Sequence, residues 1–392
     1  MTTPSSPSNI GLNIALKSPL VGTRNYPDMK LTGITDSYNH VISAFGGFDT
    51  AEIVLSGNQL NVEELFDTGL VRHVQVHNQG LSLVWEGFVD EIELVIGGLT
   101  MTRGPVMGIA NRVSAVYADD GSGPGPVPPV IGARDVTAIA DNTASQALYG
   151  IVEKVLSTGP RDATEAEQER DTYLAENAYP ATSQQLTLGQ TGSKAQVTLR
   201  CKGYFNWLDA YVYNYVVDKL TTTVSTKLRR ILAADTNAIF STDYSGIETN
   251  AVATGGYEDD DMMAMALIKS AVALGGASYD RYLFGVYDNR KVIAETSSSN
   301  WEYQWRIADR SQNVYNRSGA KVDPWDIKPG KWLFLPDFLS NRTQPTNLRL
   351  DPRMIFIESV SFDAPYGLTI TGGKTDRLPQ LLAELSLGGI DS

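Results

Sequence analysis

Residues 84–98, VWEGFVDEIELVIGG, limit most strongly what this chain can fold into. From Phe88 onward, apolar and acidic residues alternate with a period of two, which is typical of a β-strand with one face in a core and the other in water. Gly97 and Gly98 then supply the two-residue turn that a tight hairpin requires. The segment therefore predicts a hairpin over residues 84–103, apolar toward a core and acidic toward solvent.

The two aromatic residues of this segment add a geometric condition. Trp85 and Phe88 are three positions apart, so a regular strand would place them on opposite faces. A bulge at Gly87 would bring both rings to one side. Beyond that point, Glu91 and Glu93 are expected to face solvent.

Length and charge bound the possible functions. At 392 residues the chain is expected to form about two to four compact units. Its formal net charge of -13 is the opposite of the basic surface that duplex binding needs, so nucleic acid is not expected as a tight ligand.

Cys201 is the only cysteine, which excludes an intrachain disulfide and a cysteine metal cage, and we expect it in a buried strand. No secretory start and no run of ~20 apolar residues is visible, so we expect synthesis in the cytoplasm and no stable membrane insertion.

Composition shifts divide the chain. Residues 1–118 read as an N-terminal β unit, and residues 119–134 as a Pro/Gly-rich linker or loop. Residues 135–221 read as an α+β segment, whose strands at 186–202 are candidates to complete the first unit. Residues 222–392 form a second α+β unit.

Four or five helices and a second hairpin are predicted along the chain. The charge-rich residues 160–180 predict a helix capped by Asp162 or Thr164. Residues 223–236 predict another, and Asp259–Asp261 suit the start of a third, because acids stabilise helix N-termini. Asp288–Asn289 is typical of a hairpin turn.

Two short motifs contain the residue types of a zinc site and of a nucleotide site, but their sequence context does not match such sites. His73 and His77 have the spacing of a zinc helix, but the residues between them alternate, which favours a solvent-facing strand. Residues 367–375 resemble a phosphate loop, but the first glycine is misplaced by one position and LTIT is typical of a strand. We therefore expect no cofactor and no metal.

An enzymatic site is poorly supported. The chain has three histidines and no serine in a Gly-x-Ser-x-Gly turn, which argues against a nucleophilic triad. A pair of glycosidase carboxylates among the 45 acids stays open, because their separation depends on the fold. An aromatic cluster could stack sugars, but packing is favoured; it comprises Tyr204, Phe205, Trp207, Tyr211, Tyr213 and Tyr215.

Several longer segments resemble a known family. FGGFDTAEIVLSG, WEGFVDEIELVIGGLTMTRG and IANRVSAVYA resemble the first barrel of tail hub proteins, which are minor tail proteins at the baseplate hub or tail tip of long-tailed bacteriophages. ALYGIVEKVLSTG, YLAENAYP and VTLRCKGYFNWL resemble the segments after that barrel in such proteins. The resemblance extends over nearly the full length of the chain.

This resemblance implies a mostly β (α+β) fold with two tail-tube-like β-barrel or sandwich domains joined by helix-containing segments. It implies a non-enzymatic virion protein at the tail tip, made in the host cytoplasm, that forms a trimeric ring around the DNA channel. The implied partners are the tail tube protein, the distal tail protein and central spike or fibre proteins. A hexameric distal tail ring protein and a glycan-binding or glycan-cleaving tail component are the alternatives.

An acidic wet face in such a ring would repel the phosphates of passing DNA, so contact with DNA would be transient and non-specific. We expect the hairpin 84–103 to make ring or lumen contacts and the linker 119–134 to dock a neighbouring protein. The candidate interface or lumen residues are Trp85, Glu86, Phe88, Asp90, Glu91, Glu93, Arg103, Tyr204 and Trp207.

Overall fold

The structure is a computed structural model of the chain. It describes residues 11–119, 134–188, 195–213, 222–254, 262–276, 281–298, 300–306, 313–337, 353–364 and 367–372.

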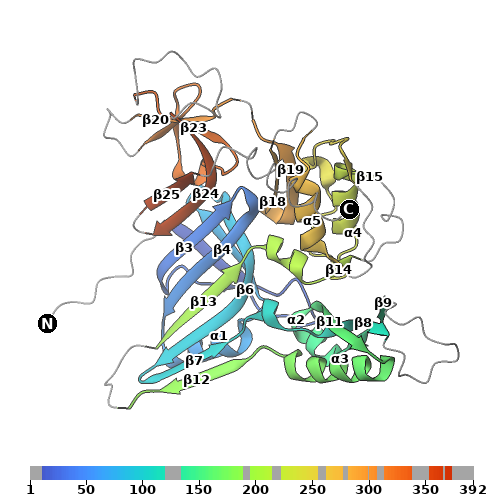
Figure 1. Cartoon of the computed structure of the whole chain (residues 1–392). Helices are drawn as coiled ribbons and strands as arrows, with labels where there is room; N and C mark the ends of the chain where they lie inside the picture. The colour runs from blue at the N-terminus through green and yellow to red at the C-terminus, as the bar shows by residue number, and fades with distance from the viewer. Residues whose placement is uncertain are drawn as a thin grey trace.

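Eight strands, each antiparallel to its neighbours, form one continuous sheet across the molecule (Figure 1). We call it the main sheet. Its strands come from four separate parts of the sequence, so most of its pairings join distant segments. In spatial order they are β25 (Gly367–Gly372), β24 (Met354–Ala364), β3 (Thr35–Ser43), β4 (Phe45–Ser56), β13 (Gln196–Lys202), β6 (Leu83–Ile96), β7 (Leu99–Arg103) and β12 (Thr182–Leu186).

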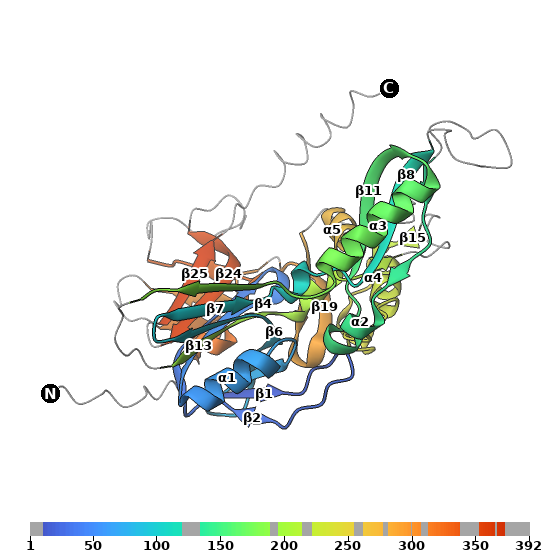
Figure 2. The same ribbon diagram turned by 90° about the horizontal axis from the view of Figure 1, so that it is seen from below.

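One face of the main sheet carries the core. Alternate residues along β4 and β6, such as Ile53 and Ile92, are fully buried. Helix α1 (Gln59–Thr68) packs on this side with Val62 and Leu65 buried, and the Asn58 side chain caps it by accepting from the backbone of residue 61. Figure 2 shows α1 on the same side as β1 (Leu12–Lys17) and β2 (Met29–Lys30).

Strand β6 pairs with different strands along its two halves. Its first half pairs with β5 (His73–Asn78), which also pairs with β1, whereas its second half pairs with β7. The predicted hairpin with its Gly97–Gly98 turn is therefore confirmed. The bulge predicted at Gly87 is wrong: Gly87 pairs regularly with Val74, and the register shifts lie next to Val84 and Asp90 instead. Glycine is needed there because a Cβ atom would lie 2.2 Å from the carbonyl oxygen of Lys202.

Residues 104–181 form an insertion between β7 and β12. Its elements are η1 (Val106–Gly108), β8 (Arg112–Asp119), β9 (Arg134–Val136), β10 (Ala140–Asp141), α2 (Thr143–Tyr149), β11 (Glu153–Arg161) and α3 (Ala163–Asn177). Its sheet contains a parallel pair, β8 and β11, with α3 packed on β8. Asp162 caps α3 by accepting from the backbone of Glu165, as one of the two sequence alternatives predicted. Most of the linker 119–134 lies outside the described residues.

The chain after β13 adds two helices and a hairpin. The elements are η2 (Tyr204–Asp209), β14 (Val212–Tyr213), β15 (Thr222–Thr223), α4 (Val224–Ala233), η4 (Tyr244–Gly246), β16 (Ala253–Thr254), β17 (Met262–Met263), α5 (Ala264–Ala273), β18 (Tyr282–Tyr287), η5 (Asp288–Arg290) and β19 (Lys291–Thr296). Strand β18 pairs in parallel with the start of β4 and antiparallel with β19, and the predicted hairpin turn at Asp288–Asn289 is confirmed. The third predicted helix begins at Ala264, and Asp259–Asp261 lie outside the described residues.

A small sheet extends the N-terminal half of β24. It comprises β20 (Tyr303–Trp305), β21 (Val314–Asn316), β22 (Lys321–Val322) and β23 (Trp332–Phe334), with η6 (Pro324–Asp326) between the last two. The predicted mostly β, α+β class is confirmed. The expected barrels are not closed in the described part of the chain, because the main sheet ends at β12 on one side and at β25 on the other.

Candidate functional site

No element of the described part of the chain covers the second face of the main sheet, and we call this the polar face. The registers of the seven strand pairs place one set of side chains on this face, and none of them is buried. Hydroxyl, amide and charged groups dominate the set. Its members are Asn39, Val41, Ser43, Glu52, Val54, Ser56, Glu91, Glu93, Val95, Thr100, Thr102, Ser183, Gln185, Gln196, Thr198, Arg200, Ser359, Ser361, Asp363, Thr369 and Thr371.

Alternation along each strand explains this two-sided character. Leu199 and Ile53 point into the core, whereas their sequence neighbours Thr198, Arg200 and Glu52 point outward. Antiparallel sheets commonly bury one face and leave the other in water. A sheet of this width with a polar face offers a broad surface for contact with water or with a polar partner.

Three acidic residues of the polar face surround Arg200. Its guanidinium donates through Nη2 to Glu93 at 2.9 Å and through Nη1 to Glu91, and its Nε lies 3.8 Å from the Glu52 carboxylate. These three acids stand on the strands β6 and β4 that flank β13. The hydrogen bond to Glu91 is the main cause that raises the pKa of Arg200 above its usual value. The cluster carries three negative charges and one positive charge, a formal total of −2.

Of the predicted site residues, Glu91 and Glu93 lie on the polar face. The four aromatic candidates lie inside the folded chain instead, because the first half of β6 and the short helix η2 turn their rings into the core. Phe88 packs edge-on against Trp207 with ring centroids 5.2 Å apart. All four candidates, namely Trp85, Phe88, Tyr204 and Trp207, are buried. Buried side chains cannot contact a neighbouring molecule or DNA directly.

Two predicted acids are also buried. Asp90 accepts from the backbone of Met107 at 2.8 Å and pairs with Lys202 at 2.9 Å, since the adjacent bulge turns it away from the other acids. Glu86 accepts from the backbone of Arg290, and burial raises its pKa. These carboxylates hold the fold together and do not belong to the polar face.

The last predicted residue, Arg103, connects elements. Its guanidinium donates to the Tyr149 hydroxyl in α2 and to the Asp67 carbonyl in α1, each at 3.0 Å. It therefore fixes the end of β7 at the entry to the insertion.

The histidine pair lies in strand β5, so the strand interpretation is confirmed. His73 does not face solvent: it is buried, its Nδ1 lies 2.6 Å from the Tyr204 hydroxyl, and burial lowers its pKa to about 4. At neutral pH it is uncharged, so its 3.9 Å approach to Glu86 is not an ion pair. Within the described ranges, no group of three metal-ligating side chains is found.

The aromatic cluster is packed in the core, as favoured. Tyr204, Phe205, Trp207, Tyr211 and Tyr213 are buried, and Tyr215 lies outside the described residues. These rings are therefore not a sugar-stacking platform.

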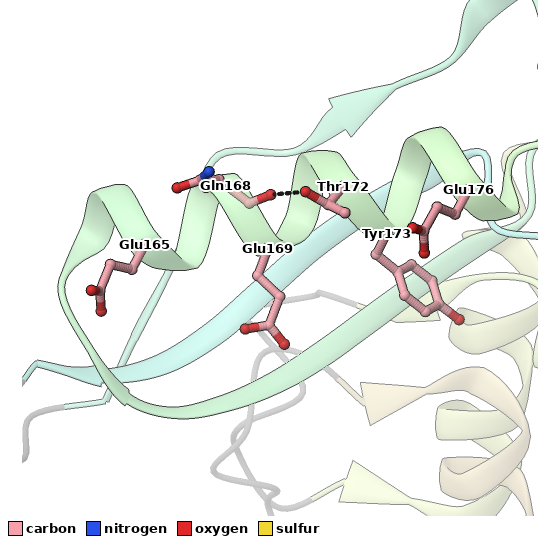
Figure 3. Close-up of a pocket in the computed structure, with 6 residues that line it drawn as sticks. All are labelled: Glu165, Gln168, Glu169, Thr172, Tyr173 and Glu176. Carbon is pink, nitrogen blue, oxygen red and sulfur yellow. Dashed lines mark hydrogen bonds between the residues drawn. The ribbon is translucent and has the colours of Figure 1, made fainter.

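A pocket of about 450 Å³ runs along α3 (Figure 3). Among the described residues its lining comes from a single helix, and the Thr172 hydroxyl there donates to the carbonyl of Gln168, as in an ordinary helix surface. The lining residues are Glu165, Gln168, Glu169, Thr172, Tyr173 and Glu176.

Among the residues that the structure describes, no strand pairs with the outer edge of β12 or of β25. Thr187 donates to the Gly98 carbonyl and Gly104 donates to the Ala181 carbonyl, which fixes the hydrogen-bond phase of the β7–β12 pair. In that phase the backbone groups of residues 182, 184 and 186 point away from β7, toward the open edge. All five residues of β12 are exposed, and β25 at the other edge is largely exposed.

The sequence interpretation missed the polar face as a unit. Its signals were present in the short alternating runs TSQQL, SVSFD and GLTITG, but these lie far from the hairpin 84–103. Arg200 was missed too, because VTLRCKG reveals its alternation but not the acids on its neighbours.

Comparison with known proteins gives structural matches only. No protein-family model matches the chain, and no curated protein matches it. The 43 kDa tail protein of prophage MuSo2 from Shewanella oneidensis is similar with a TM-score of 0.43 and 8% identity, over 93% of this chain and 97% of that one. The tail protein from Neisseria meningitidis MC58 gives 0.39 and 7%, over 91% and 94%. Likenesses at these TM-scores do not by themselves establish a shared fold.

No helix in the described ranges has both the length and the apolar character of a membrane-crossing segment.

Proposed function

We propose that this chain is a structural protein of a bacteriophage tail, in which copies close into a ring and the polar face lines the channel. The observation that carries the proposal is the main sheet itself, which is wide, polar on its uncovered face and open at both edges. The sequence resemblance to tail hub proteins supports a position of the ring at the tail tip.

The direction of the edge strands favours a ring. The main sheet has eight strands and every neighbouring pair is antiparallel, so β12 and β25 run in opposite directions. When a second copy is rotated about an axis along the strands, its β12 therefore meets β25 of the first copy antiparallel. The polar face then continues on the same side from copy to copy. Contacts of this head-to-tail kind close into rings and remove exposed edges.

The width of the sheet supports the smaller ring. Neighbouring strands lie about 4.8 Å apart, so eight strands span roughly 38 Å. Three copies would enclose a channel roughly 37 Å across between backbones, and six copies one about twice as wide, before strand tilt widens both. A trimer thus leaves room for a duplex after side chains project inward, and we favour it over the hexameric distal tail ring.

The charge of the polar face suits passage of DNA. Glu52, Glu91, Glu93 and Asp363 outnumber Arg200 and Lys202, the basic residues that β13 presents beside them. Carboxylates repel phosphates, so DNA would pass without sticking. The partners implied by the resemblance, namely the tail tube protein, the distal tail protein and central spike or fibre proteins, belong to the same proposal. The glycan alternative loses one of its two motivations, because the described residues of the aromatic cluster are buried.

Mass measurement of the purified assembly, followed by electron microscopy, tests the proposal. We expect a closed ring of three copies with Glu91 and Glu93 toward the channel. A particle that stays monomeric at high protein concentration would count against it, and so would a ring with these residues on its outer wall.

A further inference from the structure

The two basic side chains that β13 presents beside the acids of β4 and β6 are both occupied. Arg200 is surrounded by Glu52, Glu91 and Glu93. Lys202 lies 2.9 Å from the buried carboxylate of Asp90. Each cation of this strand segment therefore has a carboxylate from β6 as its partner.

Arg200 is nevertheless accessible. Its side chain is 44% exposed, so burial does not protect it from an anion in solution. A free arginine at such a position would bind phosphate well, because its planar guanidinium donates two parallel hydrogen bonds. The neighbouring acids alone decide whether it can do so.

We infer that Glu52, Glu91 and Glu93 act as a cage that keeps Arg200 from binding the phosphates of nucleic acid. Nη1 and Nη2 each donate to one of the two β6 carboxylates, and the third carboxylate faces Nε. A phosphate would have to displace a carboxylate and approach the remaining negative charges at the same time. The inference rests on the proposed function, since the cage matters where DNA passes over the polar face.

The cage also explains why an arginine stands on this face at all. Glu52 on β4 and Glu91 on β6 lie directly opposite Arg200 in the two strand pairs. Glu93 lies diagonally across from Arg200, two residues beyond Glu91 on β6. Three carboxylates this close would repel one another, and like charges on adjacent strands destabilise a sheet. Arg200 removes that repulsion while its own charge is hidden from a polyanion, so the face is stable and still repels phosphate.

Opening the cage in the free protein tests the inference. The triple variant Glu52→Gln, Glu91→Gln and Glu93→Gln keeps the size of the side chains but leaves Arg200 with neutral partners. We expect it to bind a short DNA duplex at least about tenfold more tightly than the unchanged protein, with an affinity that falls as salt rises. The single variant Glu93→Gln, which frees only Nη2, should give a smaller gain.

Two controls separate the cage from a change in overall charge. Adding Arg200→Gln to the triple variant should abolish the gain. The matched variant Glu63→Gln, Glu64→Gln and Glu176→Gln makes the same charge change at exposed positions on α1 and α3, and it should gain little.

The outcomes are decisive in both directions. A triple variant that folds, as judged by its urea unfolding, and gains no affinity overturns the inference. A gain that survives Arg200→Gln overturns it as well. Because duplex binding is measured on the free chain and ring closure by microscopy, a failed ring would refute the proposed function and leave this result standing.

Discussion

Oε1 of Glu86 accepts a hydrogen bond from the backbone nitrogen of Arg290 at 2.5 Å, across 204 residues of sequence. Asn289 and Arg290 both adopt the left-handed conformation, with φ of 58° and 59°. That conformation costs roughly 1–2 kcal/mol for a residue other than glycine. The Glu86 carboxylate therefore holds a strained turn and ties β6 to the hairpin of β18 and β19.

Replacing Glu86 should release this turn. We expect Glu86→Ala to lower the free energy of unfolding by about 2–4 kcal/mol, because the Arg290 N–H would lose its acceptor in a partly buried place. Glu86→Gln keeps an acceptor oxygen and should cost less than half as much. Urea unfolding of the three proteins measures the difference, and equal losses for both variants would show that the hydrogen bond is unimportant.

Stability should fall in mild acid because of two buried histidines. Burial lowers the pKa of His40 to about 3 and that of His73 to about 4, from an ordinary 6.5. A depressed pKa means that the folded state binds protons less readily than the unfolded state. The stabilisation is therefore complete above about pH 6.5 and is lost as pH falls toward 4, by at most about 1.4 kcal/mol per pH unit for each group.

Urea unfolding at several values between pH 7 and pH 4.5 measures this dependence. His40→Leu and His73→Gln should each flatten the curve. His77→Asn is the control, because His77 lies in the same strand as His73 and is more exposed. A curve that keeps its full slope in the His40 and His73 variants would contradict the assignment.

Gly47 marks the joint between the two halves of the chain. Its φ is 76°, and a Cβ atom there would lie 2.4 Å from the carbonyl oxygen of Val286 on β18. We expect Gly47→Ala to lower the free energy of unfolding by about 3 kcal/mol or more, because strain and a backbone clash combine. Gly33→Ala is the matched control, since nothing lies within 4 Å of its added carbon. Thermal unfolding of both variants checks the contrast.

The open edge at β12 can be altered without disturbing β7. The backbone N–H of Gln184 points to the open edge, whereas that of Gln185 points to β7. Gln184→Pro should therefore change the stability of the protomer by less than about 1 kcal/mol, yet weaken ring formation at least about tenfold. Gln185→Pro should also destabilise the protomer. Analytical ultracentrifugation with urea unfolding separates the effects, and unchanged assembly of the Gln184 variant would exclude β12 from the interface.

The local features of the fold could be predicted from sequence, because they depend on neighbouring residues. The turn at Gly97–Gly98, the cap at Asp162 and the turn at Asp288–Asn289 each follow from the preferences of a few residues. The position of β13 between β4 and β6 could not, since it depends on pairing between segments far apart. For the same reason, alternation predicted a solvent face for Glu91 and Glu93 but could not find the Arg200 between them.

Burial of the aromatic candidates was unpredictable for another reason. Tyr204 and Trp207 stand in a dense aromatic run without a clear period, so alternation does not tell which side they face. The short helix η2 turns them both onto the core side of β6, against Phe88. Only the completed sheet defines that side.

The insertion between β7 and β12 has a consequence for the order of events in the cell. Strand β12 comes after residues 104–181 in the chain and reaches its place only when Ala181 has returned beside Gly104. In the proposed ring, a copy whose insertion has not folded would therefore lack the strand that joins it to its neighbour. If the proposed ring forms through β12, folding of the insertion would have to precede assembly, and unfolded copies would be excluded from the ring.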